Sequence, residues 1–121
     1  MNIEEIKQYF LDKKGAEETY PFNMQVPVFK VGGKMFALIN VHEDEESINL
    51  KYNKDEIQML RSSFEGIVPG YHMNKSHWNT LYISKLEDSL IKELIDISYN
   101  LVYKSLTKAV KLKIEEEQNL S

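Results

Sequence analysis

The sequence VPVFKVGGKMFALINV at residues 26–41 contains two β-rich runs on either side of a pair of glycines. Gly32 and Gly33 predict a two-residue hairpin turn, because glycine readily adopts the positive φ angles that such turns require. Pro27 lacks an amide proton, so it favours the start of a strand or a sheet edge. We therefore predict an antiparallel hairpin here and build the rest of the fold around it.

Further strands extend this hairpin into a sheet. Residues 47–52 alternate in character, with Ile48, Leu50 and Tyr52 on one face, which is typical of a half-buried strand. Residues 78–83 predict a last strand. Two shorter extended pieces are expected at 18–22 and 66–70.

Three helices complete the pattern. Asn2-x-x-Glu5 reads as a capping box before apolar residues at helical spacing, and Gly15 provides an exit, so a helix is expected over 2–14. By the same reasoning, Asn53-x-x-Glu56 predicts the start of a helix over 54–63, and Ser84-x-x-Glu87 predicts the start of the final helix. That final helix carries a broad apolar stripe that would cover a sheet.

The element order is therefore α-β-β-β-β-α-β-β-α, without regular βαβ alternation. This order predicts the α+β class: an antiparallel sheet covered by N- and C-terminal helices. The 121 residues fit a single domain, assigned to 1–107. Residues 108–121 are expected to be a C-terminal helix extension or a frayed tail.

Composition excludes several classes of protein. The chain has no cysteine, so disulfides, thiolate metal sites and thiol nucleophiles are ruled out. It has no apolar run of membrane-spanning length and no signal-peptide pattern, so we expect a cytoplasmic protein that does not associate with membranes. The sequence leaves the oligomeric state open, with a monomer favoured. The net charge is −4, with acidic runs at 43–46 and 115–117. Between 47 and 85, however, basic residues outnumber acidic ones, so a local basic face is compatible with the global charge.

Several segments together resemble the MmcQ/YjbR family, over roughly residues 1–107. The most specific block is Pro-Gly-Tyr-His-Met-Asn-Lys-x-His-Trp-Asn at 69–79. The other matching segments are Tyr20-Pro21-Phe22, Gly33-Lys34-Met35-Phe36-Ala37, Leu50-Lys51 and Ser98-Tyr99-x-Leu101-Val102.

The resemblance implies a CyaY-like fold, also described as a double-wing arrangement, and a bacterial source. Members of the family are commonly labelled DNA-binding by analogy with double-wing domains. The resemblance supplies no catalytic residues to carry over.

The segment 69–78 is the expected centre of any functional site. Its aromatic side chains could stack on bases, its basic side chains could contact phosphate, and its amides could bond to bases or sugars. The residues predicted to bind nucleic acid are Lys34, Lys51, Tyr71, His72, Asn74, Lys75, His77 and Trp78. Because the chain has one arginine, the commonest specific base reader, we expect weak and salt-sensitive DNA binding through the backbone.

Other interpretations of the same segment stay open. Tyr71 and Trp78 could be packed residues with bonded polar ends. The aromatic residues could instead line a small-ligand pocket beside Trp78, or the domain could bind a protein partner. Catalysis is not expected, because His72 and His77 are five residues apart and no nucleophile elbow or phosphate loop is present. We expect no metal and no cofactor; the mildly acidic first helix, which iron chaperones of this fold share, is offset by lysines.

Overall fold

The computed structural model describes residues 1–41 and 44–120. Its elements, in chain order, are α1 (Ile3–Leu11), β1 (Ala16–Thr19), β2 (Val28–Val31), β3 (Lys34–Asn40), β4 (Ser47–Lys51), α2 (Ile57–Ser63), β5 (Ile67–Pro69), β6 (Trp78–Tyr82), a 3₁₀ turn (Ile83–Lys85), α3 (Asp88–Ser105) and α4 (Lys108–Leu120). The predicted acidic turn at 43–46 begins outside the described residues. No helix in the described part of the chain is both long and apolar enough to cross a bilayer.

The strands form one antiparallel sheet in the order β1-β2-β3-β4-β6-β5, which confirms the α+β prediction. The predicted hairpin joins β2 to β3, and its turn residues Gly32 and Gly33 have φ angles of 58° and 83°. The register shifts between Phe29 and Lys30, which leaves Phe36 as the extra residue of a β-bulge. The bulge lets Phe36 and Ala37 both contribute to the core.

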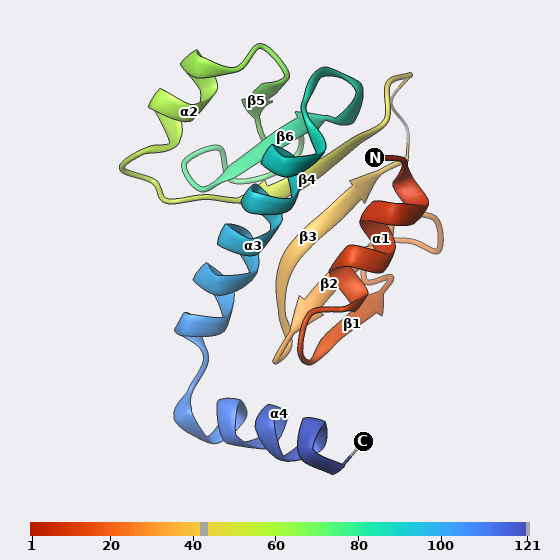
Figure 1. The fold of residues 1–121 in the computed structure, drawn as a ribbon, viewed down its shortest axis with the longest axis vertical. Helices are drawn as coiled ribbons and strands as arrows, with labels where there is room; N and C mark the ends of the chain where they lie inside the picture. Colours follow the sequence, from red (N-terminus) through yellow and green to blue (C-terminus); the bar gives the residue numbers. More distant parts are fainter. Residues whose placement is uncertain (42–43, 121) are drawn as a thin grey trace.

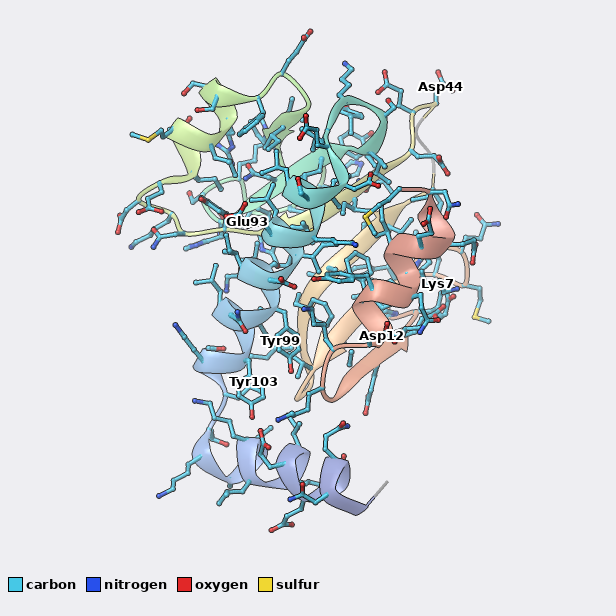
Figure 2. The ribbon with its side chains drawn as sticks, viewed as in Figure 1. Lys7, Asp12, Asp44, Glu93, Tyr99 and Tyr103 are labelled. Carbon is cyan, nitrogen blue, oxygen red and sulfur yellow. The ribbon has the colours of Figure 1, made fainter. Side chains whose placement is uncertain are left out.

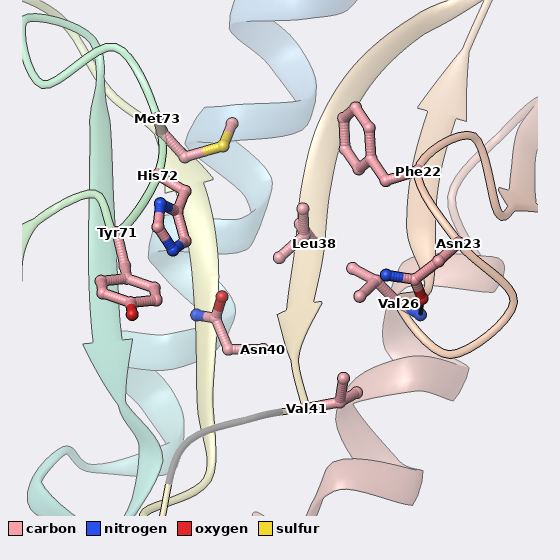
Figure 3. Close-up of a pocket in the computed structure, with 9 residues that line it drawn as sticks. All are labelled: Phe22, Asn23, Val26, Leu38, Asn40, Val41, Tyr71, His72 and Met73. Carbon is pink, nitrogen blue, oxygen red and sulfur yellow. Dashed lines mark hydrogen bonds between the residues drawn. The ribbon is translucent and has the colours of Figure 1, made fainter.

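Helices α1 and α3 lie side by side over one face of the sheet (Figure 1). The core is between these helices and the sheet, and Phe10 of α1 packs there on Phe29 and Phe36 with ring centroids 4.7 and 6.0 Å apart. Figure 3 looks onto the opposite face, with both helices behind the strands. We call this opposite side the open face.

A hydroxyl from α3 replaces part of the ladder between β3 and β4. The pairing of these strands ends at Ala37 and Leu50. Beyond that point, Ser98 accepts from the Lys51 N–H at 2.8 Å and donates to the Phe36 carbonyl at 2.6 Å. Because Ser98 is fully buried, these two bonds satisfy groups that would otherwise be desolvated without a partner.

The C-terminal residues 108–120 form a separate helix, α4, after a break at Leu106 and Thr107. Thr107 starts this helix by accepting the Val110 N–H at 3.2 Å. The buried Ile114 packs on Gly15, where any Cβ would come within 2.9 Å of the Ile114 side chain. Tyr99 and Tyr103 lie on the same side of α3 (Figure 2). From there the Tyr103 hydroxyl donates a hydrogen bond to Glu115 of α4.

The predicted capping boxes have mixed outcomes. The first is confirmed, since Asn2 and Glu5 exchange both capping bonds. The other two are wrong. Asn53 Oδ1 accepts the N–H of the nearby Asp55 instead of capping a helix, and α2 begins three residues later than predicted. The N-cap residues Glu56 of α2 and Glu87 of α3 make no side-chain capping bond. Local Asx turns of this kind compete directly with helix capping.

Candidate functional site

A cavity of about 320 Å³ lies on the open face, above β3 and β4 (Figure 3). Its floor comes from β3, one wall from the loop at 20–27, and the other wall from the loop at 70–77. The lining residues are Phe22, Asn23, Val26, Leu38, Asn40, Val41, Tyr71, His72 and Met73. The volume is at the lower end of the range typical of small-molecule sites, and the lining is mostly apolar with a few polar groups, as such sites require.

A polar network lies beneath one side of the cavity. Asn49 of β4 and Thr80 of β6 are register partners, and both are buried. The Thr80 hydroxyl accepts the Tyr71 N–H at 2.9 Å and donates to Asn49 Oδ1 at 2.6 Å, while Asn49 Nδ2 donates to the Tyr71 carbonyl at 3.2 Å. Both backbone groups of Tyr71 are therefore fixed to the sheet.

This network sets the orientation of Asn40. Because the Tyr71 carbonyl can only accept, Asn49 must present its oxygen to its other neighbours. Asn40 Nδ2 donates to that oxygen at 2.9 Å and to Ser47 Oγ at 3.0 Å. Both amide protons of Asn40 are thus used, and its Oδ1 has no hydrogen-bond partner among residues 1–41 and 44–120. Figure 3 shows this oxygen directed toward the space between the two walls.

The wall formed by Tyr71 and His72 is a strained turn. The Met73 N–H bonds the Gly70 carbonyl at 3.3 Å, and His72 occupies the third position with a φ of 59°. That is the position of a type II turn where glycine is normally required. Within the described residues, His72 is the only non-glycine with a positive φ. Its ring packs on Tyr71 with centroids 4.0 Å apart, and strain of this kind is concentrated at functional sites.

Arg61 of α2 holds the far end of the same loop. Its guanidinium donates to Asn79 Oδ1 at 2.7 Å, to the Trp78 carbonyl at 3.1 Å and to the Lys75 carbonyl. Burial lowers the pKa of Arg61, which still stays charged at physiological pH. The only arginine in the chain therefore uses Nε and Nη2 to position the loop.

The opposite wall is fixed by a second set of contacts. Asn23 Oδ1 accepts the N–H groups of Gln25 and Val26 at 2.8 and 3.1 Å, which closes the loop on itself. Phe22 is 64% exposed despite being apolar. Glu18 lies at the base of this loop. Its burial favours the protonated carboxyl, but hydrogen bonds from Tyr20 and Lys7 favour the carboxylate more strongly, so the pKa of Glu18 is lowered.

The structure brings together only some of the eight residues predicted to bind nucleic acid. Tyr71 and His72 line the cavity, and Asn74, Lys75 and His77 follow on the same loop. Asn74 Oδ1 is used locally, because it accepts the Ser76 N–H at 2.9 Å.

The remaining three predicted residues are placed less favourably for such an interface. Lys51 is half-buried at the end of β4, where it pairs with Trp78. Trp78 is only 8% exposed and lies outside the cavity lining, so its ring is packed. Lys34 is at the β2–β3 hairpin, where its Nζ donates to Ser105 Oγ at 3.3 Å at the end of α3, apart from the loop.

Several residues that shape the site were missed by the sequence reasoning. Asn40, Asn49 and Thr80 come from three strands, and only the strand register brings their side chains together. Leu38 and Val26 read simply as β-rich residues. One signal was available in the polar Asn40, which interrupts the apolar run of β3.

Other features of the surface offer less chemistry. A second hollow of about 400 Å³ is lined by Phe64, Lys85, Leu86, Glu87 and Leu90, none of which belongs to the predicted site. Among the described residues, no group of three or more His, Asp or Glu side chains is arranged to hold a metal ion.

Comparison with known proteins gives full-length similarities. The family model described as YjbR matches residues 11–101. The Escherichia coli K12 protein named "Uncharacterized protein YjbR" is 33% identical over 121 residues, which cover 99% of this chain and 97% of that protein. The YbdF protein of E. coli O157:H7 is 36% identical over 106 residues, 87% of each chain.

Solved structures agree with this assignment. The crystal structure of Deinococcus radiodurans protein DR2400 is similar with a TM-score of 0.85 and 31% identity, over 94% of this chain and 88% of that one. A crystal structure from Pseudomonas syringae has a TM-score of 0.73 and 28% identity, over 84% of this chain and 99% of that one.

Proposed function

We propose that this chain, which belongs to the YjbR family, is a small-molecule-binding protein whose site is the cavity on the open face. The observation that carries the proposal is the apolar cavity itself, enclosed by two loops that are each fixed by their own hydrogen bonds. The loop at 70–77 is fixed at both ends, and it keeps His72 in a conformation that costs free energy. A ligand that contacts this wall would explain why the strained conformation of His72 is retained.

The geometry supports this function better than the DNA interface predicted from the sequence. Stacking by Trp78 is disfavoured by its burial, and Lys34 is bonded at the end of α3 instead of extending a basic surface around the loop. Among the residues described by the structure, the cavity lining contains no lysine, arginine or carboxylate. A role in binding without catalysis fits this lining, because it offers no pairing of a nucleophile with a carboxylate or lysine.

Methyl NMR of the protein labelled with [methyl-¹³C]methionine tests the proposal. Met73 lines the cavity, whereas Met59 is 74% exposed on α2 and serves as an internal control. Titration with neutral aromatic compounds (phenol, benzyl alcohol and indole) is expected to shift the Met73 resonance and leave that of Met59 in place. The proposal fails if no compound moves Met73 at millimolar concentration, or if Met59 moves equally.

A pair of variants locates the binding. Phe22→Ala removes an exposed apolar side chain from the cavity wall, and Leu112→Ala removes one that is 53% exposed on α4. We expect the first substitution to weaken binding severalfold and the second to leave it unchanged. A single-stranded DNA oligonucleotide is titrated in parallel; a Met73 shift with the oligonucleotide alone would favour the nucleic-acid function instead.

A further inference from the structure

We infer that the ligand is a neutral, planar aromatic molecule that donates a hydrogen bond, as a ring N–H does, to Asn40 Oδ1. The inference rests on the proposed function and specifies its ligand class. It combines three features of the cavity: an acceptor without a partner among residues 1–41 and 44–120, a described lining without carboxylate, lysine or arginine, and aromatic side chains on both walls.

The hydrogen bonds of Asn40 determine that its oxygen, and not its amide nitrogen, is available to a ligand. An asparagine side chain normally offers both a donor and an acceptor, so it does not discriminate between ligand groups. Here both protons of Asn40 Nδ2 are held by Ser47 and Asn49. Turning the amide over would place its oxygen against Asn49 Oδ1, an unfavourable contact between two acceptors. The cavity therefore selects a ligand donor at this point.

The ligand should carry no charge where it meets the lining. Among the lining residues that the structure describes, none is a carboxylate, lysine or arginine, and a charge buried without a partner is costly. A carboxylate on the ligand would also meet the Asn40 oxygen, which cannot donate to it. These restrictions disfavour a negatively charged ligand group at the Asn40 end of the cavity.

The shape of the cavity favours a flat ring. Phe22 lies on one side of Leu38, and His72, Tyr71 and Met73 lie on the other (Figure 3). Aromatic and thioether side chains pack favourably against ring faces and edges. A planar ring can stand on Leu38 between these walls with its N–H edge toward Asn40.

Two isomers separate the N–H contribution from size and hydrophobicity. 3-Methylindole has a ring N–H, and 1-methylindole has the same composition but no donor. Each is titrated against the full-length protein while the Met73 methyl resonance is followed. We expect 3-methylindole to bind about tenfold more tightly, as expected for one hydrogen bond to an otherwise unpaired acceptor.

Two variants assign the preference to Asn40. In Asn40→Ala the affinity ratio of the two isomers should fall to about one. In the control Leu112→Ala, which changes an exposed side chain of α4 outside the cavity lining, the preference for 3-methylindole should remain. A preference that survives in Asn40→Ala would overturn the inference.

The outcomes distinguish the inference from the proposed function. If both isomers bind at Met73 of the unchanged protein with equal affinity, the inference is wrong and the small-molecule site stands. If neither isomer nor any other neutral aromatic compound reaches Met73, both are wrong. The two isomers are compared in the unchanged protein, so the inference is tested even if Asn40→Ala does not fold.

Discussion

The positive φ of His72 predicts that two substitutions at this position weaken binding equally but differ in their effect on stability. Substitution by glycine removes both the imidazole and the strain of an L-residue at φ 59°, whereas substitution by alanine removes the imidazole alone. Comparing the two variants with each other cancels the lost contact between His72 and Tyr71. What remains is the backbone preference at one position of the turn.

The magnitude follows from two opposing terms. A non-glycine residue in the left-handed region costs roughly 1–2 kcal/mol, and the extra chain entropy that glycine loses on folding costs roughly 0.5–1 kcal/mol. His72→Gly should therefore be more stable than His72→Ala by about 0.5–1 kcal/mol, or about 2–4 °C in Tm for a domain of this size. At an ordinary strand or helix position the order would be reversed.

Urea and thermal denaturation followed by circular dichroism measure this difference, and titration with 3-methylindole measures binding. Both variants should bind severalfold more weakly than the unchanged protein, because both lose the same part of the wall. If His72→Ala is as stable as His72→Gly, the turn is not strained and the reasoning is refuted. If binding is unchanged in both, His72 is not part of the site.

Three further predictions concern the supports of the site and the docking of α4. Arg61→Lys should lower the free energy of unfolding by about 2 kcal/mol, because an ammonium cannot replace a guanidinium that donates to three separate acceptors; an unchanged urea midpoint would show that these bonds contribute nothing. Ser98→Ala should cost about 2 kcal/mol by leaving a backbone donor and acceptor between β3 and β4 without a partner, and near-neutral stability would mean that the strands close over the gap. Hydrogen bonds from Lys14 and Tyr103 lower the pKa of Glu115 below its ordinary 4.5, so its stabilisation of α4 should be complete above that pH and be lost as the pH falls through the lower folded value. Hydrogen-exchange protection factors for α4 should then fall on acidification in the unchanged protein, and they should depend less on pH in Glu115→Gln.

The sheet could largely be predicted from the sequence because its signals are local. Gly32 and Gly33 define the hairpin, and alternation in residues 47–52 defines its neighbour. The start of α2 could not be predicted, because an asparagine such as Asn53 can either cap a helix or form an Asx turn, here with Asp55, and the sequence looks the same in both cases. The break before α4 was likewise left open by the sequence.

The candidate site could likewise be predicted only in part. The loop carrying Tyr71 and His72 is chemically distinctive and could be singled out from the sequence, but the cavity beside it depends on pairing between distant strands. Asn40 pairs with Ser47, and Asn49 pairs with Thr80, across 7 and 31 residues of sequence. Such contacts follow from the register of the sheet, which a single sequence does not give.

The most direct test of the cavity as a ligand site is the set of intermolecular nuclear Overhauser effects in the complex with 3-methylindole. We predict contacts from the indole protons to the methyl groups of both Leu38 and Met73, because these residues form the floor and one wall of the same cavity. Contacts to the Leu86 and Leu90 methyl groups of the second hollow, or an absence of any contact to Leu38, would contradict this assignment of the site.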